Sequence, residues 1–104
     1  MLRVGCPMWA HRPWVGRHLP AGTRVGHELA AYSRLFQAVE GNTTFYAAPA
    51  PTTIDKWAHQ LRGAPPFRFV FKVPRSITHD RRLRDVHDEL AAFCALVEPL
   101  GAHV

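Results

Sequence analysis

The segment FRFVFKV, residues 67–73, alternates large apolar side chains with a second set that carries two cations. A period of two is typical of a β-strand that buries only one of its faces. The apolar set is Phe67, Phe69, Phe71 and Val73, and the second set is Arg68, Val70 and Lys72. We therefore expect a strand over 67–73 whose two faces meet different surroundings.

Strands and helices alternate on both sides of this segment. Further strands are predicted over 2–6 and 38–45, and helices over 28–37, from Pro51 to a stop at Gly63, and over 84–100. The expected inner stripe of the last helix is Val86, Leu90, Phe93, Cys94 and Val97. Residues 7–26 contain two tryptophans without a sustained period, which indicates a long ordered loop.

This order predicts an α/β fold with parallel strands joined by right-handed crossovers. A (βα)8 barrel uses about 31 residues for each unit, so 104 residues hold three of them. We expect a TIM-like (βα) barrel of which only the first three βα units are present. Three parallel strands leave open edges and an uncovered face. Residues 1–104 are thus expected to be the N-terminal fragment of one barrel domain; the alternative is a small open α/β domain covered by the 7–26 loop.

Composition is that of one globular domain, with 47% apolar and 20% charged residues. The net charge of +5 suits an anionic partner such as nucleic acid or phosphate, although an ordinary basic surface gives the same balance. No apolar run approaches the roughly 20 residues of a membrane span, and no signal peptide is visible, so we expect a cytoplasmic protein without a membrane partner. Cys6 and Cys94 are predicted to be small buried residues.

Several blocks of the chain resemble the opening of the YecE-like family, the domain of unknown function 72. They are VGCPMWAH at 4–11 with Trp14, YSRLF at 32–36, VEGNTTFY at 39–46, FRFVFK at 67–72 with Pro74, and ITH at 77–79. VEGNTTFY is the most specific of them. The resemblance implies a TIM-like barrel of about twice this length or more. The activity of the family is not established, and the likeness of such barrels to sugar isomerases and abasic-site endonucleases is an analogy of fold.

In such barrels the site lies where the strands end and in the loops that follow. The catalytic candidates there are Glu40, Lys72 and His79, and the ligand-binding candidates are Trp9, His11, Asn42, Thr44, Tyr46 and Arg75. The period of two predicts that Glu40 and Lys72 point into the barrel from adjacent strands, that Asn42 and Thr44 share the face of Glu40, and that Gly5 lies beside it.

Each candidate has a chemical and a structural interpretation. Lys72 could bind an anionic or carbonyl oxygen while Glu40 orients it or acts as a base, or the two could form a buried ion pair that fixes strand register. Trp9 and Tyr46 could stack on a base or sugar ring, or anchor the loop. Arg75 could meet phosphate, or be solvated. His11 and His79 could join Glu40 at a divalent metal, but their spacing is not diagnostic. We therefore predict no metal site and leave the cofactor unknown.

The resulting expectation is an uncharacterised YecE-like protein that binds an anionic or phosphate-bearing ligand at the C-terminal mouth of the barrel. The alternatives are a non-catalytic nucleic-acid-binding module and an inactive truncated fragment. Neither the dinucleotide-binding nor the phosphate-loop glycine motif is present. The expected partners are nucleic acid or a phosphate-bearing small molecule, together with the C-terminal half of the barrel. The sequence leaves the oligomeric state open.

Overall fold

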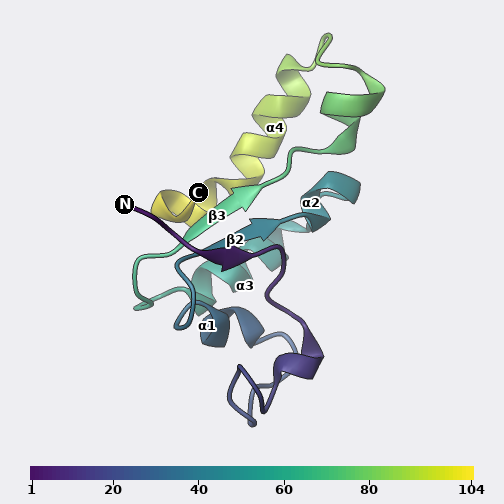
Figure 1. Cartoon of the computed structure of the whole chain (residues 1–104). Helices are drawn as coiled ribbons and strands as arrows, with labels where there is room; N and C mark the ends of the chain where they lie inside the picture. Colours follow the sequence, from purple (N-terminus) through teal and green to yellow (C-terminus); the bar gives the residue numbers. More distant parts are fainter.

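A computed structural model describes all residues from 1 to 104. The chain forms a three-stranded parallel sheet in the order β1-β2-β3 (Figure 1). The strands are β1 at Gly5–Cys6, β2 at Ala38–Gly41 and β3 at Arg68–Phe71. This arrangement confirms the predicted α/β class and the parallel direction of the strands.

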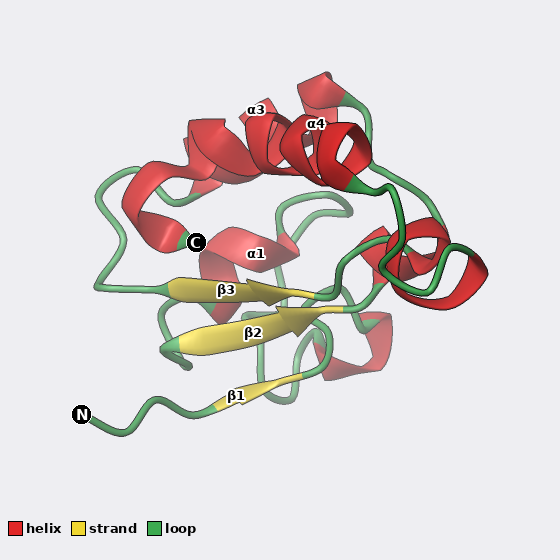
Figure 2. Cartoon of the chain, turned by 90° about the horizontal axis from the view of Figure 1, so that it is seen from above, coloured by secondary structure: helices red, strands yellow, loops and turns green.

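The longer helices lie on one side of this sheet. They are α1 at Glu28–Tyr32, α3 at Pro51–Gln60 and α4 at His87–Val97. Figure 2 shows α3 and α4 side by side over one face of the strands, while no helix covers the opposite face. Short helices occupy the connections: η1 at Arg12–Trp14, α2 at Thr43–Tyr46, η2 at Ser76–Asp80 and η3 at Glu98–His103. None of the helices combines the length and apolar character that crossing a bilayer requires.

The core fills the space between the sheet and the helices. Its buried side chains include Val39 and Phe69 from the strands, Tyr32 from α1 and Ile54 from α3. The predicted alternation in β3 is confirmed, because Phe67 and Phe69 are buried whereas Arg68, Val70 and Lys72 are exposed. We call the surface formed by the exposed set, together with Glu40 of β2, the open face of the sheet.

The predicted strand over 38–45 is wrong beyond Gly41, because the chain turns there into α2. The Thr44 hydroxyl donates to the Lys72 carbonyl oxygen at 2.6 Å and also lies 3.0 Å from the Gly41 carbonyl oxygen. The β-branched threonines favour a strand locally, but this contact with the end of β3 fixes a helical turn instead. The strand pattern predicts that Asn42 and Thr44 share the face of Glu40. This prediction is wrong, because both residues lie beyond the end of β2.

The first strand is also shorter than the predicted 2–6. Leu2 and Val4 are exposed, since no element of the chain packs on them, and only Gly5 and Cys6 pair with β2. A Cβ on Gly5 would collide with the Ala38 carbonyl group, so a glycine permits the close approach of β1 to β2. Gly5 lies on the same face of the sheet as Glu40, as predicted. Its partner in register is Ala38, however, and not Glu40.

The last helix buries only part of the predicted stripe. Phe93 and Val97 are buried and Leu96 is half-buried, whereas Leu90 and Cys94 are exposed. The buried stripe continues to Leu100, so it follows the three- and four-residue spacing of a helix face that starts at Phe93. The prediction that both cysteines are buried is wrong for Cys94, and Cys6 is half-buried.

Candidate functional site

A cavity of about 770 Å³ opens where β1 and β2 end. Its walls come from the loop after β1, the end of β2, the short helix α2 and the α3 helix. Four of the sequence-predicted residues line it together, namely Trp9, Glu40, Asn42 and Tyr46. Residues from separate segments thus meet at the carboxyl ends of the strands, which is the edge where α/β sheets and barrels commonly bind ligands.

The aromatic walls of this cavity differ in how firmly they are held. The half-buried Trp9 ring lies 5.0 Å from Trp57 and 5.8 Å from Phe69, both in edge-to-face geometry. Trp9 therefore anchors the loop to the core while one side of it lines the cavity. Tyr46 is 79% exposed and contacts the Phe45 ring at 5.0 Å, so most of its ring is available to a ligand.

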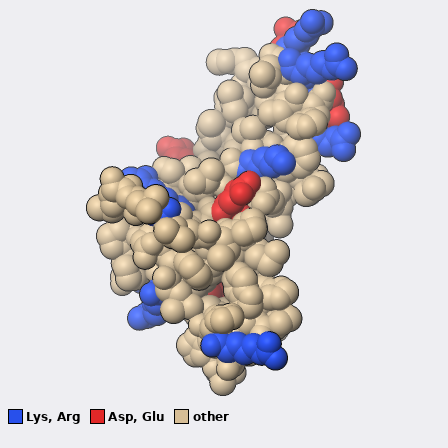
Figure 3. Space-filling model, viewed as in Figure 1, with Lys and Arg blue, Asp and Glu red and all other residues tan.

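Glu40 and Lys72 lie on the same face of the sheet, as the period of two predicted. Glu40 is in register with Val70, and Lys72 lies two residues further along, directly after β3, where its N–H still donates to the Gly41 carbonyl oxygen at 3.2 Å. Both side chains are exposed, and no ion pair joins them. In this chain, whose sheet has one uncovered face, Glu40 and Lys72 therefore form no buried ion pair; the interpretation for the closed barrel stays a prediction. Figure 3 shows an acidic and a basic group adjacent near the centre of this side of the molecule, with further basic groups around its edges.

Phe45 contacts both Lys72 and the third catalytic candidate, His79. The Lys72 Nζ lies 4.2 Å from the centroid of the Phe45 ring, a cation–π contact, and the His79 ring meets that same phenyl group edge to face at 5.0 Å. The His79 Nδ1 lies 2.8 Å from the hydroxyl of Thr78. Lys72 and His79 are thus neighbours on Phe45, but neither lines the 770 Å³ cavity.

The remaining predicted residues lie outside the cavity. His11 contacts Trp14 edge to face at 5.3 Å, and Arg75 forms an exposed ion pair with Asp80 at 3.4 Å. Thr44 is buried and bonded to backbone oxygens, which makes its role structural. No group of three or more His, Cys, Asp or Glu side chains is placed to hold a metal ion.

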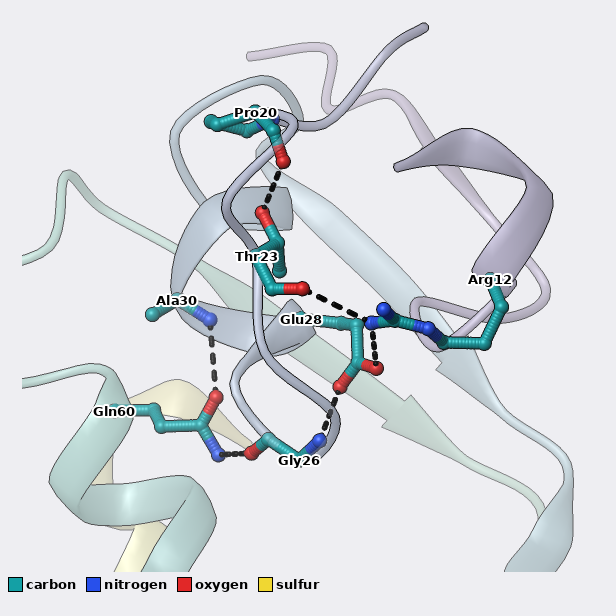
Figure 4. A network of polar contacts seen from close by, with 7 residues as sticks. All are labelled: Arg12, Pro20, Thr23, Gly26, Glu28, Ala30 and Gln60. Carbon is teal, nitrogen blue, oxygen red and sulfur yellow. Dashed lines mark hydrogen bonds and ion pairs between the residues drawn. The ribbon is translucent and has the colours of Figure 1, made fainter. Parts of the chain in front are cut away.

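A polar network that sequence reasoning did not identify holds the 7–26 loop, which lines part of the cavity, in place (Figure 4). The side chain of Glu28 is only 4% exposed; its Oε1 accepts from the Arg12 Nη1 at 2.9 Å, and its Oε2 accepts from the Gly26 N–H at 2.8 Å. The Gln60 amide accepts from the Ala30 N–H at 3.2 Å and donates to the Gly26 carbonyl at 3.0 Å. The network therefore ties the 7–26 loop to both α1 and α3.

The carboxyl group of Glu28 stays charged in this network. Burial by itself would raise its pKa, but hydrogen bonds from the backbone N–H groups of Glu28 and Gly26 and from the Arg12 guanidinium outweigh that effect. The net result is a pKa below the ordinary value of 4.5. In the sequence, Glu28 appears only as an acid in the first turn of a helix, a common position that gives no sign of its partner sixteen residues away.

Tyr32 is a second residue that the sequence did not single out. Its hydroxyl accepts from the Cys6 N–H at 2.7 Å and donates to the Ala38 carbonyl at 2.9 Å, so one buried side chain joins β1 to β2. Burial is the main cause that raises the pKa of Tyr32 to about 12 from an ordinary value of 10.0. This bridge fixes the base of the loop that carries Trp9 and Arg12.

Comparison with known proteins places the chain in a family. The model of the family described as "Protein of unknown function DUF72" matches residues 3–104. UPF0759 protein YecE of Escherichia coli (strain K12) and its counterpart in Escherichia coli O157:H7 are each 37% identical over 105 residues, which cover 100% of this chain and 35% of theirs. The chain thus spans about a third of the length of these relatives. No solved structure matches it. Because the family match extends over nearly every residue, the chain belongs to the DUF72 family.

Proposed function

We propose that this chain supplies part of a binding site for an anionic, phosphate-bearing small molecule at the C-terminal mouth of a TIM-like barrel. The single observation that supports this most is the cavity in which Trp9, Glu40, Asn42 and Tyr46 come together from separate segments. A cavity of about 770 Å³ lies within the size range of small-molecule sites.

The chemistry of the cavity walls suits a ring that carries polar groups. The exposed ring of Tyr46 offers a stacking surface, as aromatic side chains do for bases and sugars. The Asn42 amide can both donate and accept, and the Glu40 carboxylate makes no hydrogen bond within the chain, so it can accept from hydroxyl or amino groups of a ligand.

Lys72 supplies the charge for an anionic or carbonyl oxygen. Its ammonium group has no carboxylate partner, and its contact with Phe45 holds it on the open face beside His79. Glu40 on the same face can orient the bound oxygen or act as a base.

Binding of this chain to the phosphate backbone of a nucleic acid has weaker support from the structure. The arginines at the far end of the molecule are interleaved with acids, since Arg75 pairs with Asp80 at 3.4 Å and Arg81 lies 3.8 Å from Glu89. Such pairs reduce the positive potential that phosphate backbones require. A small-molecule ligand is therefore the better proposal.

The complete barrel and the cytoplasmic location are part of the same proposal. Three parallel βα units with one uncovered face, in a chain about a third as long as its relatives, fit the start of a TIM-like barrel. The further strands would close the sheet and add residues to the mouth.

Equilibrium titration with adenosine 5′-monophosphate tests the proposed function, with the intrinsic fluorescence of Trp9 and Trp57 in the cavity wall as the signal. We expect saturable binding to the chain, and a loss of about tenfold in affinity for Lys72→Met, because a charge-assisted contact is removed. Arg68→Met is the control: it removes an exposed cation at the opposite end of β3, outside the cavity, where the Arg68 Nη1 donates to the Val104 carbonyl oxygen at 3.1 Å. This control should change the affinity less than about twofold.

Three results would contradict the proposal. One is the absence of saturable binding by the folded chain. Another is a large fall in the melting temperature of Lys72→Met with unchanged affinity, which would make Lys72 structural. The third is an affinity for single-stranded DNA that exceeds the affinity for the mononucleotide and falls steeply with salt, which would favour the nucleic-acid alternative.

A further inference from the structure

Arg12 faces the cavity with part of its guanidinium group uncommitted. Its Nη1 donates to Glu28 Oε1 at 2.9 Å and to the Thr23 carbonyl oxygen at 3.2 Å. The Nε and Nη2 groups of Arg12 make no hydrogen bond within the chain, although both carry N–H donors. The side chain is 46% exposed and lines the same cavity as Glu40, Asn42 and Tyr46.

The network around Glu28 fixes the orientation of this guanidinium group. Glu28 is almost fully buried and is itself held by the Gly26 N–H at 2.8 Å, so its carboxylate gives Arg12 a rigid partner (Figure 4). Because a long flexible side chain is already ordered, a ligand that meets its free N–H groups loses less conformational entropy on binding.

Glu28 occupies only one edge of the Arg12 guanidinium group. Its Oε1 accepts from Nη1, and its Oε2 accepts from the Gly26 N–H instead of from a second Arg12 donor. The Nε and Nη2 donors of Arg12 therefore remain free for an oxygen of a ligand in the cavity.

We infer that Arg12 is an anion-binding residue of this cavity, that Glu28 is its positioning residue, and that the phosphate group of the ligand binds to the free Arg12 N–H donors. The inference deepens the proposed function and rests on it. Planar guanidinium groups bind phosphate through two N–H donors in parallel. Since Tyr46 lines the same cavity, the ligand class is a single molecule that carries both a ring and a phosphate, such as a nucleoside monophosphate.

Arg12 and Lys72 then have separate tasks. The segment with Arg12 follows β1, Lys72 follows β3, and β2 with Glu40 runs between them in the sheet. Arg12 lines the cavity and Lys72 does not, so Arg12 recognises the phosphate and Lys72 binds another oxygen on the open face.

The test compares adenosine 5′-monophosphate with adenosine, which has the same ring system but no phosphate. The readout is the ratio of their affinities, which depends on the phosphate contact and does not depend on the folded fraction of a variant. We expect Arg12→Met to lower this ratio by tenfold or more and Glu28→Gln to lower it several-fold, because the guanidinium loses its fixed partner. Arg17→Met, in the same loop but outside the cavity, should leave the ratio unchanged.

Arg12→Lys covers the case in which Arg12→Met does not fold. Lysine keeps the charge that pairs with Glu28 but lacks the planar set of donors, so the ratio should still fall several-fold at an unchanged melting temperature. An unchanged ratio in either folded variant overturns the inference even if mononucleotide binding itself is intact. Failure of the unsubstituted chain to bind the mononucleotide contradicts the proposed function as well, so the two failures are distinguishable.

Discussion

The two faces of the sheet are built from the same strands and have opposite surroundings. In β3, Phe69 is 3% exposed beneath the helices, while its neighbour Val70 is 62% exposed on the open face. The covered face holds stacked aromatic rings, and the open face holds unpaired charges beside apolar side chains. The covered face therefore supplies most of the folding free energy, whereas the open face carries the exposed Glu40 and Lys72.

Adjacent substitutions in β3 give the strongest test of this difference. Phe69→Ala should lower the free energy of unfolding by about 3–5 kcal/mol, because it opens a cavity among rings that lie 4.9 Å from Phe71 and 5.4 Å from Phe67. Val70→Ala should change it by less than about 0.5 kcal/mol. Urea denaturation followed by circular dichroism measures both, and equal losses would mean that the two faces do not differ energetically.

The hydroxyl bridge at Tyr32 tests how β1 is held at the edge of the covered face. Tyr32→Phe removes the hydrogen bonds to the Cys6 N–H and the Ala38 carbonyl oxygen, and each of these partly buried bonds contributes about 0.5–1.5 kcal/mol. We expect the total to be smaller than the loss for Phe69→Ala, and we expect the amide of Cys6 to exchange with solvent faster.

Alkaline pH provides the control for Tyr32. Its pKa is raised to about 12 in the folded chain, so its contribution to stability is complete below pH 10.0 and is lost as the pH rises through 12. Tyr32→Phe should remove this part of the alkaline loss. If the variant and the unsubstituted chain lose stability in parallel above pH 10.0, the bridge is not what binds β1 to β2.

The network at Glu28 is expected to have a smaller effect. Glu28→Gln keeps the shape but removes the charge that accepts from Arg12 and Gly26, which should cost about 1.5 kcal/mol at neutral pH. Because the folded pKa of Glu28 lies below 4.5, this stabilisation is present above that pH and disappears as the pH falls through the folded value. Thermal melts should therefore show the chain and the variant converging in acid; a gap that is constant with pH would contradict the assignment.

The smallest expected effect on stability concerns the open face itself. Exposed Val70, with free edges on β1 and β3, predicts that the isolated chain self-associates. Val70→Thr should weaken this association in sedimentation experiments and change the free energy of unfolding by less than about 0.5 kcal/mol. A monodisperse monomer at high concentration would show that the open face needs no cover.

Local patterns predicted most of the elements but not all of their ends. The alternation around Phe69 placed β3 correctly, and the start at Pro51 and the stop at Gly63 placed α3. The strand over 38–45 was extended too far, because the β-branched Thr43 and Thr44 favour a strand until the Thr44 hydroxyl meets the Lys72 carbonyl. That partner lies 28 residues away in sequence, so no local pattern reveals it.

The candidate site could be predicted only in part, because here too some of the decisive contacts join residues that are far apart in the sequence. Position at the strand ends selected Trp9, Glu40, Asn42 and Tyr46, and these four line one cavity. The same reasoning also selected Thr44, whose hydroxyl is used within the fold, and it passed over Arg12. Arg12 is oriented by its hydrogen bond to Glu28, sixteen residues away. The loop between them has no periodicity that would reveal this contact.

The sequence by itself determined the order of strands and helices, the difference between the two faces of β3 and the DUF72 family, because periodicity and motifs are properties of neighbouring residues. Only the tertiary structure decided where β2 gives way to α2, which predicted residues share the cavity, and that Arg12 is held toward it by a buried carboxylate. Those features depend on contacts between residues far apart in the chain, whose free energy overrides local preference.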